Sequence, residues 1–311
     1  DGKDRLSIML NSLNLTGETR IIYPLVKKWF CSVYAWSFRD LDPNINYQVF
    51  TREVLILHSD QSKFGKTSFF GYVGFKHKME EICSGSSLPV FHSFNGNFDG
   101  DSTYKLNVKR NGFLTCIDDI DNCIINSNGQ LRAELTEEVV SGRLLYSNVT
   151  AHHKVRTKYC GTTNNKYVLN NARDNRYLVV TVGSPIDFES GWNDPLQLWA
   201  QIQQMLKEDS SLANFTHQES EVVRNLNREY LFRDPLEQFL TDKFEFNIDG
   251  DFELIDIKNE IMTGGLGVPN DKILGAKLKK LFEPQGGELT RRIGNPQKRF
   301  YNISLRRAPS F

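Results

Sequence analysis

The chain has 311 residues, of which 39% are hydrophobic and 12% aromatic, and 38 basic side chains balance 38 acidic ones. Such a composition excludes an intrinsically disordered protein, and the length suits a core domain of about 200 residues with one small module. No apolar run approaches the ~20 residues of a membrane helix and no signal peptide opens the chain, so we expect a cytoplasmic protein without a membrane partner.

The five cysteines, at positions 31, 83, 116, 123 and 160, include no Cys-x-x-Cys pair, which argues against a zinc site. Cys116 and Cys160 lie in apolar runs expected to form central strands, where thiols behave as small apolar groups. This usage is typical of a reducing compartment.

The first chemical signal is Gly65-Lys66-Thr67, which follows a strand-like apolar run, residues 53–58, and precedes Ser68-Phe69-Phe70, a suitable first helical turn. Amides at a helix N-terminus bind polyphosphate, Lys66 can neutralise terminal phosphates and the Thr67 hydroxyl can ligate magnesium. Asp60 departs from the P-loop pattern, because it stands at the position of the first glycine. The expected cofactors are ATP and Mg²⁺, held by Ser62, Gly65, Lys66, Thr67 and Ser68.

The second signal is a hydrophobic run, residues 113–117, that ends in the paired carboxylates Asp118 and Asp119. Beside a P-loop, Asp118 could hold the magnesium through water while Asp119 orients or deprotonates the attacking water. Asp121 is a competing candidate for these roles. The structural alternative is an acidic turn that closes a buried strand.

The third signal is Asn164, which ends another strand-like run and could touch the γ-phosphate or the attacking water. Arg176 lies on the next segment, just before an apolar run, and could reach the nucleotide of a neighbouring subunit as an arginine finger. Arg173 is the alternative finger. The structural alternative for both is a surface arginine paired with Asp174 or Asp187.

Together these signals carry a family resemblance. Residues 156–164, then Leu169 and Asn175-Arg176-Tyr177, resemble the R-x-x-x-x-G-T-[TS]-N … G-N-R-R-F block of virulence-associated protein E-like and related phage primase-helicase ATPases. These are superfamily-three helicases of the AAA+ class, and residues 19–30 resemble the helical segment before their P-loop. Asp119 stands where many relatives have glutamate, and Tyr177 stands where the family has phenylalanine.

The resemblance covers roughly residues 10 to 190 and implies an α/β fold with a P-loop AAA+ core of the superfamily-three type. We expect an N-terminal helical segment over residues 1–50, the ATPase core over 51–190, and a C-terminal helical and winged-helix-like domain over 191–311. The boundary is placed in the turn-rich stretch 183–195. By resemblance, ATP sites shared between subunits imply a homo-hexameric ring, and a primase or polymerase domain is expected upstream.

The C-terminal region combines basic charge with helix and hairpin signals. Residues 258–307 contain eleven Lys or Arg and four Asp or Glu, an excess of seven positive charges. A capping box at Thr216–Glu219, helix starts at Pro235 and Pro269, and a turn at 294–296 resemble a winged-helix domain. The expected DNA contacts are Lys272, Lys277, Lys280, Arg291, Arg292, Lys298 and Arg299. The alternatives are a solvated basic face or a subunit contact.

A second expected DNA element is a hairpin over residues 144–159, inside the core. By resemblance its tip, with His152, His153 and Lys154, projects into the ring channel and grips single-stranded DNA, with Arg143 at its base. Adjacent histidines are otherwise ordinary exposed surface.

These expectations favour an ATP-dependent DNA helicase or translocase that acts on single-stranded or forked DNA in the replication of a phage or mobile element in a bacterial host. The first alternative is an ATP-switched replication initiator or loader with little unwinding activity. The second is a nucleotide-controlled assembly protein that does not contact DNA.

Overall fold

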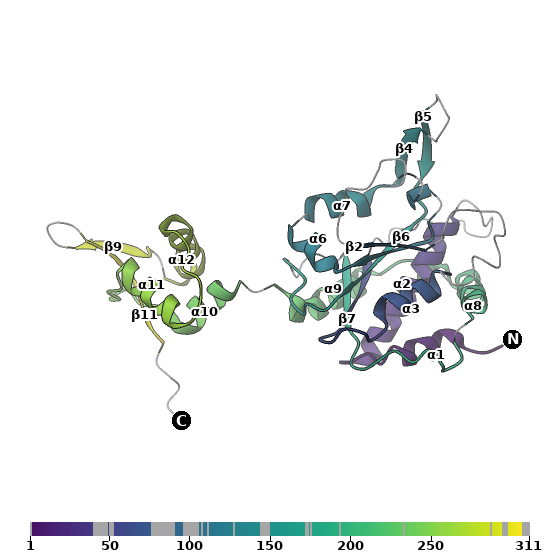
Figure 1. Ribbon diagram of the computed structural model, residues 1–311, viewed down its shortest axis with the longest axis horizontal. Coiled ribbons are helices and arrows are strands. Elements are labelled where there is room, and N and C mark those ends of the chain that lie inside the picture. The colour runs from purple at the N-terminus through teal and green to yellow at the C-terminus, as the bar shows by residue number, and fades with distance from the viewer. Residues whose placement is uncertain are drawn as a thin grey trace. The chain divides into compact units, whose positions relative to one another are not determined.

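The computed structural model describes residues 2–39, 49, 53–75, 91–95, 106, 108–110, 112–126, 128–143, 150–171, 174, 176–192, 194–232, 234–286, 288–293 and 298–306. The chain divides into two compact units, Asp1–Phe232 and Arg233–Phe311 (Figure 1). Among the described residues, no helix is both long and apolar enough to cross a membrane.

The helices of the first unit are α1 (Arg5–Ser12), α2 (Thr19–Phe38), α3 (Lys66–Val73), α6 (Ile120–Asn126), α7 (Asn128–Thr136), α8 (Pro195–Glu208), η1 (Ser210–Ala213), α9 (His217–Leu226) and η2 (Asn227–Tyr230). Its strands are β1 (Val54–His58), β2 (Phe91–Asn95), β3 (Leu114–Asp118), β4 (Val139–Arg143), β5 (Thr150–Lys154), β6 (Lys158–Thr163) and β7 (Tyr177–Thr181). The predicted strands that end at His58 and Asp118 are confirmed, and so is the strand that begins at Tyr177.

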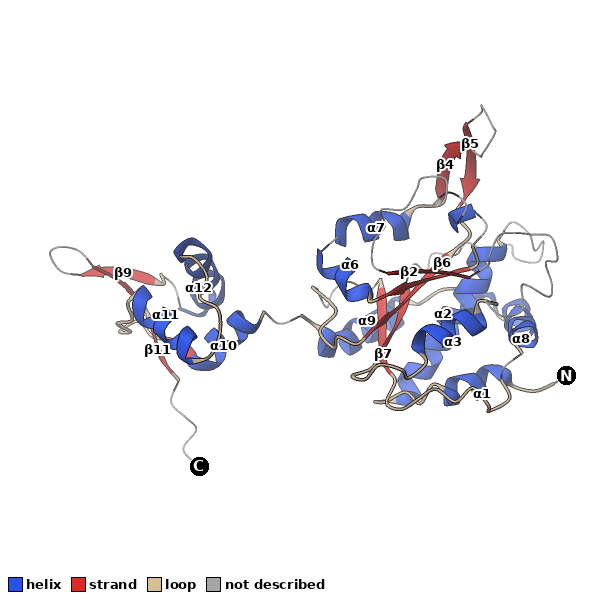
Figure 2. Ribbon diagram, in the orientation of Figure 1, coloured by secondary structure: helices blue, strands red, loops and turns tan. Residues whose placement is uncertain are grey.

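The centre of the first unit is a parallel sheet of five strands in the order β2-β3-β6-β1-β7 (Figure 2). Leu55 of β1 lies beside Cys160 of β6 and Leu178 of β7 in the ladder. Helices cover both faces, so every residue of β1 is buried and the strand reads as a continuous apolar run instead of an alternating one.

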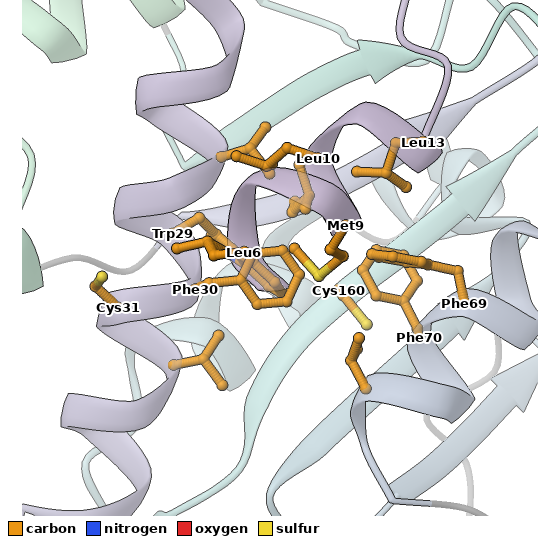
Figure 3. Close-up of a cluster of buried hydrophobic side chains, with 14 of the residues drawn as sticks. Leu6, Met9, Leu10, Leu13, Trp29, Phe30, Cys31, Phe69, Phe70 and Cys160 are labelled. Atoms are coloured by element: carbon orange, nitrogen blue, oxygen red, sulfur yellow. The ribbon is translucent and has the colours of Figure 1, made fainter. Parts of the chain in front are cut away.

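The larger of the two cores lies between the sheet and helices α1, α2, α3 and α8. Figure 3 shows side chains from α1, α2 and α3 converging on Cys160 of β6. The aromatic rings of Trp29 and Phe30 meet edge to face at 5.0 Å, and Phe30 packs likewise on Phe69 at 6.3 Å. A second core on the opposite face holds α6 and α7 against residues such as Ile56 and Tyr177. This sandwich fixes the edge of the sheet at which β1, β3 and β6 end.

The expected boundary at residues 190/191 lies inside the first unit, because α8, η1 and α9 belong to its core. Trp199 and Ile202 of α8 are buried in the larger core, and the Trp199 ring lies 5.8 Å from that of Phe30. The turn-rich stretch before α8 therefore connects two parts of one unit, and the units divide at Phe232.

The hairpin predicted over residues 144–159 is shifted along the chain. Residues 150–154 form strand β5, which pairs antiparallel with β4, so His152 lies opposite Ser141 and Arg143 lies opposite Thr150. The predicted tip is thus a strand, and the connection at 144–149 lies outside the described residues. Exposure alternates along β5, as expected of a strand, and Val140 and Val155 pack in a small separate cluster.

The second unit runs in the order α10 (Pro235–Lys243), β8 (Phe244–Phe246), α11 (Leu254–Thr263), α12 (Asp271–Gly286), β9 (Thr290–Ile293), β10 (Lys298–Tyr301) and β11 (Ile303–Leu305). Strand β9 pairs antiparallel with β10, and β8 pairs antiparallel with β11. Residues 254–258 form the first part of α11, which follows Glu253 as its N-cap. Leu274, Leu278 and Phe282 of α12 are buried in the core of this unit, whereas Ile273 is 48% exposed.

Candidate active site

The loop between β1 and α3 contains the predicted phosphate-binding tripeptide. β1 ends at His58 and α3 begins at Lys66, with Gly65 as its N-cap at φ 85°. Lys63 also has a positive φ of 69°. Left-handed backbone at these two positions turns the chain from the strand into the helix without the first glycine of the P-loop pattern.

Gly65→Ala is expected to destabilise the first unit by more than the ~1–2 kcal/mol that a left-handed alanine costs. An added Cβ would lie 2.8 Å from Cε2 of Phe188, so the ring must move as well. Gly191→Ala is the matched control, because Gly191 has φ +84° but open space around it. Urea unfolding of both variants measures the difference, and equal losses would mean that Phe188 yields without cost.

Lys66 is buried, with 7% of its surface exposed, and its ammonium group lies between two strand ends. It donates to the hydroxyl of Ser59, next to β1, and at 2.7 Å to Oδ1 of Asn164, just after β6. Burial lowers the pKa of Lys66, while the Asp119 and Asp118 carboxylates act in the opposite direction. The structure therefore brings together the predicted Lys66 and Asn164.

Asp118 ends β3 within a set of hydroxyl groups. Its Oδ1 accepts from Thr67 at 2.7 Å and from Thr162 at 2.8 Å, and its Oδ2 accepts from Ser93 at 3.1 Å. A hydroxyl and a carboxylate in contact are oxygen donors of the kind that Mg²⁺ prefers, and Mg²⁺ usually keeps several waters beside few protein ligands. Thr67 and Asp118 thus fit a magnesium ion, with Thr162 and Ser93 orienting the carboxylate.

The neighbouring carboxylates separate into two environments. Asp119 has a positive φ of 50° and lines the same cleft as Lys66, whereas Asp121 accepts a 2.8 Å hydrogen bond from Thr163 and does not line it. Aspartate tolerates left-handed backbone better than most residues, and such conformations gather at functional sites. Of the two candidates, Asp119 lines the cleft and Asp121 does not.

These groups surround a cleft of about 400 Å³, within the range of small-molecule sites. Its walls are formed by Ser62, Lys63, Phe64, Gly65, Lys66, Thr67, Ser68, Asp118, Asp119, Thr162 and Asn164. All the predicted phosphate-contacting and metal-ligating residues therefore meet at one edge of the sheet. Ser59 and Ser93 were not identified from the sequence, because isolated hydroxyl residues carry no pattern of their own. Thr162 lies in the G-T-[TS]-N block but had been given no role.

Arg176 lies apart from this cleft, in an ion cluster of its own chain. Its Nη1 is 3.1 Å from Oδ2 of Asp174, whose side chain is only 5% exposed. Arg132 of α7 reaches the same oxygen at 2.9 Å. The pairing of Arg176 with Asp174, expected as the structural alternative, is present. Arg132 also pairs with Asp174, which was not expected because α7 and the segment before β7 are distant in the chain. Arg173 lies outside the described residues.

A second cleft, of about 530 Å³, opens on the other side of the loop. Among its walls are His58 at the end of β1, Thr181 at the end of β7 and Tyr230 of η2. None of the three was singled out from the sequence. The one sequence signal for this cleft was His58, a histidine at the end of an apolar run and directly before the loop.

The candidate DNA contacts of the first unit lie on β5. His152 and Lys154 are exposed, and His152 Nδ1 is 2.7 Å from the Ser141 hydroxyl across the hairpin. His153 lies on the opposite side of the strand and is half-buried. The side chain of Arg143 lies outside the described part. The structure thus presents His152 and Lys154 on one side of β5 and turns His153 away.

In the second unit, three expected DNA contacts are engaged within the unit. Lys277 pairs with Asp234, the N-cap of α10, and with Glu237 of α10. Lys280 donates to Glu237 at 2.9 Å. Arg291 donates to the carbonyls of Ile248, Asp249 and Gly250. Lys272 is exposed. The side chains of Arg292, Lys298 and Arg299 lie outside the described part. Asp234 and Glu237, which precede the basic stretch 258–307, therefore neutralise part of its positive charge.

Lys277→Ala is expected to destabilise the second unit by about 1 kcal/mol, since it removes the cation paired with the half-buried Asp234 and leaves Glu237 with Lys280 alone. Lys272→Ala, one turn earlier on α12 and exposed, should stay within ~0.5 kcal/mol of the wild type. Urea unfolding followed by circular dichroism compares the two. Equal losses would show that the pairing of Lys277 adds no stability.

Comparison with known proteins places this site in a family context. The profile of the virulence-associated protein E-like domain matches residues 1–232, which is the first compact unit. No curated protein gave a significant match. Among solved structures, an A-form apo structure of the C-terminal region of NrS-1 is similar at 12% identity with a TM-score of 0.48, over 97% of this chain and 76% of that one. A second apo structure of that region has 13% identity and a TM-score of 0.44, over 98% and 79%.

Proposed function

The chain belongs to the virulence-associated protein E-like domain family, and from this premise we propose that it is an ATP-driven DNA helicase or translocase of replication. The observation that carries the proposal is the meeting of Lys66, Asn164, Thr67 and Asp118 at the ends of β1, β6 and β3. A cation beside a hydroxyl–carboxylate pair is the arrangement that a magnesium-bound polyphosphate requires.

In the proposed mechanism, the amides at the start of α3 and the Lys66 ammonium bind the phosphates of ATP. Thr67 and Asp118 would hold Mg²⁺, which would neutralise phosphate charge when bound. Asp119 orients the attacking water and accepts its proton, and Asn164 positions the γ-phosphate or that water. These roles are supported by the position of each of these residues in the walls of the 400 Å³ cleft.

Arg176 completes the proposed site from a neighbouring subunit, which requires a ring, and the family resemblance favours a hexamer. Asp174 holds the arginine at the surface in the separate chain, where it is 35% exposed and so accessible to a partner.

The AAA+ assignment is supported by the parallel sheet with β1 between β6 and β7.

DNA contact is proposed at two places. His152 and Lys154 on β5 would grip a single strand, and the second unit would act as a winged helix with α12 and the β9–β10 hairpin toward DNA. Its order of helix, strand, two helices and hairpin supports that assignment. Lys272, exposed on α12, is its first candidate contact. A phage or mobile element with an upstream primase is the context that the resemblance suggests.

The alternative function is an ATP-switched initiator or loader with little unwinding activity. Two observations favour it: Asp60 replaces a loop glycine, and Arg176 is engaged with Asp174 in its own chain. ATP hydrolysis over a protein titration, with and without single-stranded DNA, separates the two functions. If the chain is a translocase, the rate of ATP hydrolysis per subunit should rise with protein concentration and on addition of single-stranded DNA. A loader should hydrolyse slowly, show no stimulation by single strands and prefer a defined duplex.

A further inference from the structure

Asp121 is the carboxylate of residues 118–121 to which the proposed mechanism gives no role. It lies in the first turn of α6, is half-buried and does not line the cleft at Lys66. Its Oδ1 accepts a hydrogen bond of 2.8 Å from the hydroxyl of Thr163, the last residue of β6. Asp121 therefore contacts the strand end that precedes Asn164 and not the cleft itself.

The Thr163 hydroxyl is held from two sides. Thr163 is only 1% exposed, so few waters can compete for its hydrogen bonds. A carboxylate oxygen accepts and a backbone amide donates, so the hydroxyl proton points to Asp121 and the oxygen accepts from the amide of Asn165 at 2.9 Å. Asn164 lies between these two anchored positions. Its backbone is thus fixed on both sides, while its side chain is exposed in the cleft.

The two groups that accept from the Lys66 ammonium are both attached to Thr163. Asn164, which accepts at 2.7 Å, follows Thr163 directly in the chain. Ser59, the other acceptor, donates its backbone amide to the Thr163 carbonyl at 3.3 Å. The Ser59 hydroxyl donates to the Gln61 carbonyl at 2.6 Å, so a lone pair of its oxygen is left for Lys66. The position of Thr163 therefore sets both groups that orient the cation.

We propose that Asp121 and Thr163 are positioning residues of the nucleotide site, which hold Asn164 against Lys66 and aim its amide group at the γ-phosphate or the attacking water. The inference rests on the proposed ATP site and gives Asp121 a role without contact to the reacting atoms. Asp119, which lines the cleft, remains the group for the attacking water.

Thr163→Val and Asp121→Ala each remove one partner of the 2.8 Å hydrogen bond. Each is expected to lower the maximal rate of ATP hydrolysis about tenfold, below the ~100-fold that a displacement of about 1 Å can cost. The dissociation constant of a non-hydrolysable ATP analogue with Mg²⁺, measured by calorimetry, should stay within about twofold, as for groups that act only in the transition state. Lys66 and Thr67 still bind the phosphates in both variants.

Conservative variants separate a hydrogen bond from a role as a base. Asp121→Asn keeps an acceptor for Thr163 but removes the base, and Thr163→Ser keeps the hydroxyl. Both should hydrolyse ATP within about twofold of the wild-type rate, because the hydrogen bond is retained. If Asp121→Asn is as slow as Asp121→Ala, the carboxylate acts as a base and the proposal is overturned.

Thr115→Val is the matched control for Thr163→Val. The Thr115 hydroxyl is equally buried in the sheet, 2.6 Å from that of Thr157, and Thr115 does not line the cleft at Lys66. This variant should hydrolyse ATP within about twofold of the wild-type rate. A tenfold loss in Thr115→Val as well would show that any buried hydroxyl of the sheet has this effect, which rejects a specific role of Thr163.

A double variant tests whether Asp121 acts through Asn164. Asn164→Ala alone should slow hydrolysis, and adding Asp121→Ala to it should cost no more than about twofold, because the side chain that Asp121 positions is already gone. A tenfold loss in both backgrounds means that Asp121 acts independently and overturns the proposal. Thermal unfolding shows that each variant is folded at the assay temperature. If Asp121→Ala is not, Thr163→Val takes its place in the double variant.

The outcomes separate this proposal from the one on which it rests. If the wild type does not hydrolyse ATP, the ATPase assignment is wrong and the positioning roles are rejected with it. If the wild type hydrolyses ATP and Lys66→Ala abolishes hydrolysis, the ATP site stands. Unchanged rates in Asp121→Ala and Thr163→Val then reject the positioning roles alone.

Discussion

Lys66→Ala is expected to reduce the rate of ATP hydrolysis at least ~100-fold, which is the scale of losing one preorganised charge at a reacting phosphate. Lys66 is only 7% exposed, and its ammonium group is oriented by Ser59 and by Asn164 at 2.7 Å, so the variant loses a fixed positive charge. Phosphate release at saturating Mg²⁺ and ATP measures the effect.

Two further variants separate charge from packing. Lys66→Met keeps most of the side-chain volume and should lose as much activity as alanine, since the loss comes from the charge. Lys207→Ala removes an exposed lysine of α8 and should leave hydrolysis within about twofold. A thermal unfolding curve for each variant shows that the fold is retained. If folded Lys66→Ala hydrolyses ATP at the wild-type rate, the assigned phosphate loop is wrong.

Arg176→Ala is expected to lower turnover by about 10³-fold while ATP affinity stays within about twofold, as for an arginine that acts only on the transition state of a neighbour. Arg176 lines neither cleft of its own chain, which is why its loss should spare binding. Arg132→Ala is the matched control. It removes the other arginine on Asp174, and its effect should be far smaller if Arg176 alone reaches the neighbour.

A mixing experiment tests whether the arginine acts between subunits. Lys66→Ala and Arg176→Ala chains should each hydrolyse ATP far more slowly than the wild type, but an interface that combines Lys66 of the second with Arg176 of the first has both groups. Mixing the two proteins should therefore restore part of the wild-type turnover. No recovery, in mixtures that size-exclusion chromatography shows to co-assemble, would place Arg176 in the site of its own chain or outside catalysis.

Much of the candidate site could be predicted because its signals are local. A strand followed by Gly65-Lys66-Thr67 predicts a helix N-terminus, and a strand that ends in Asp118 and Asp119 predicts carboxylates at a sheet edge. The capping box of Thr216 with Glu219 is also present as predicted. Each of these signals depends on residues within one turn or one strand, where backbone geometry follows directly from the sequence.

Contacts between distant segments could not be predicted in the same way. The capping residues before α8 and α9 predict helices but not which core they join, and Trp199 and Ile202 place α8 on the first unit. Likewise, Lys277 reads as a free cation in the chain, and only packing of α12 on α10 brings it to Asp234 and Glu237. Charge counts along a sequence take no account of such pairing.

The sequence by itself determined the strand ends at His58 and Asp118 and the helix start after Gly65, since apolar runs, caps and turn residues act over a few positions. The order of the strands in the sheet, which only the tertiary structure shows, decided which distant residues meet at the site. Because β1 lies between β6 and β7, with β3 beyond β6, the ends of these strands bring Asn164 and Asp118 to Lys66 and Thr67 on one side of the loop. On its other side the same order joins His58 to Thr181, and η2 adds Tyr230. Those hydrogen-bonded neighbours are separated by up to 123 residues, and strand pairing together with burial of both sheet faces holds them together.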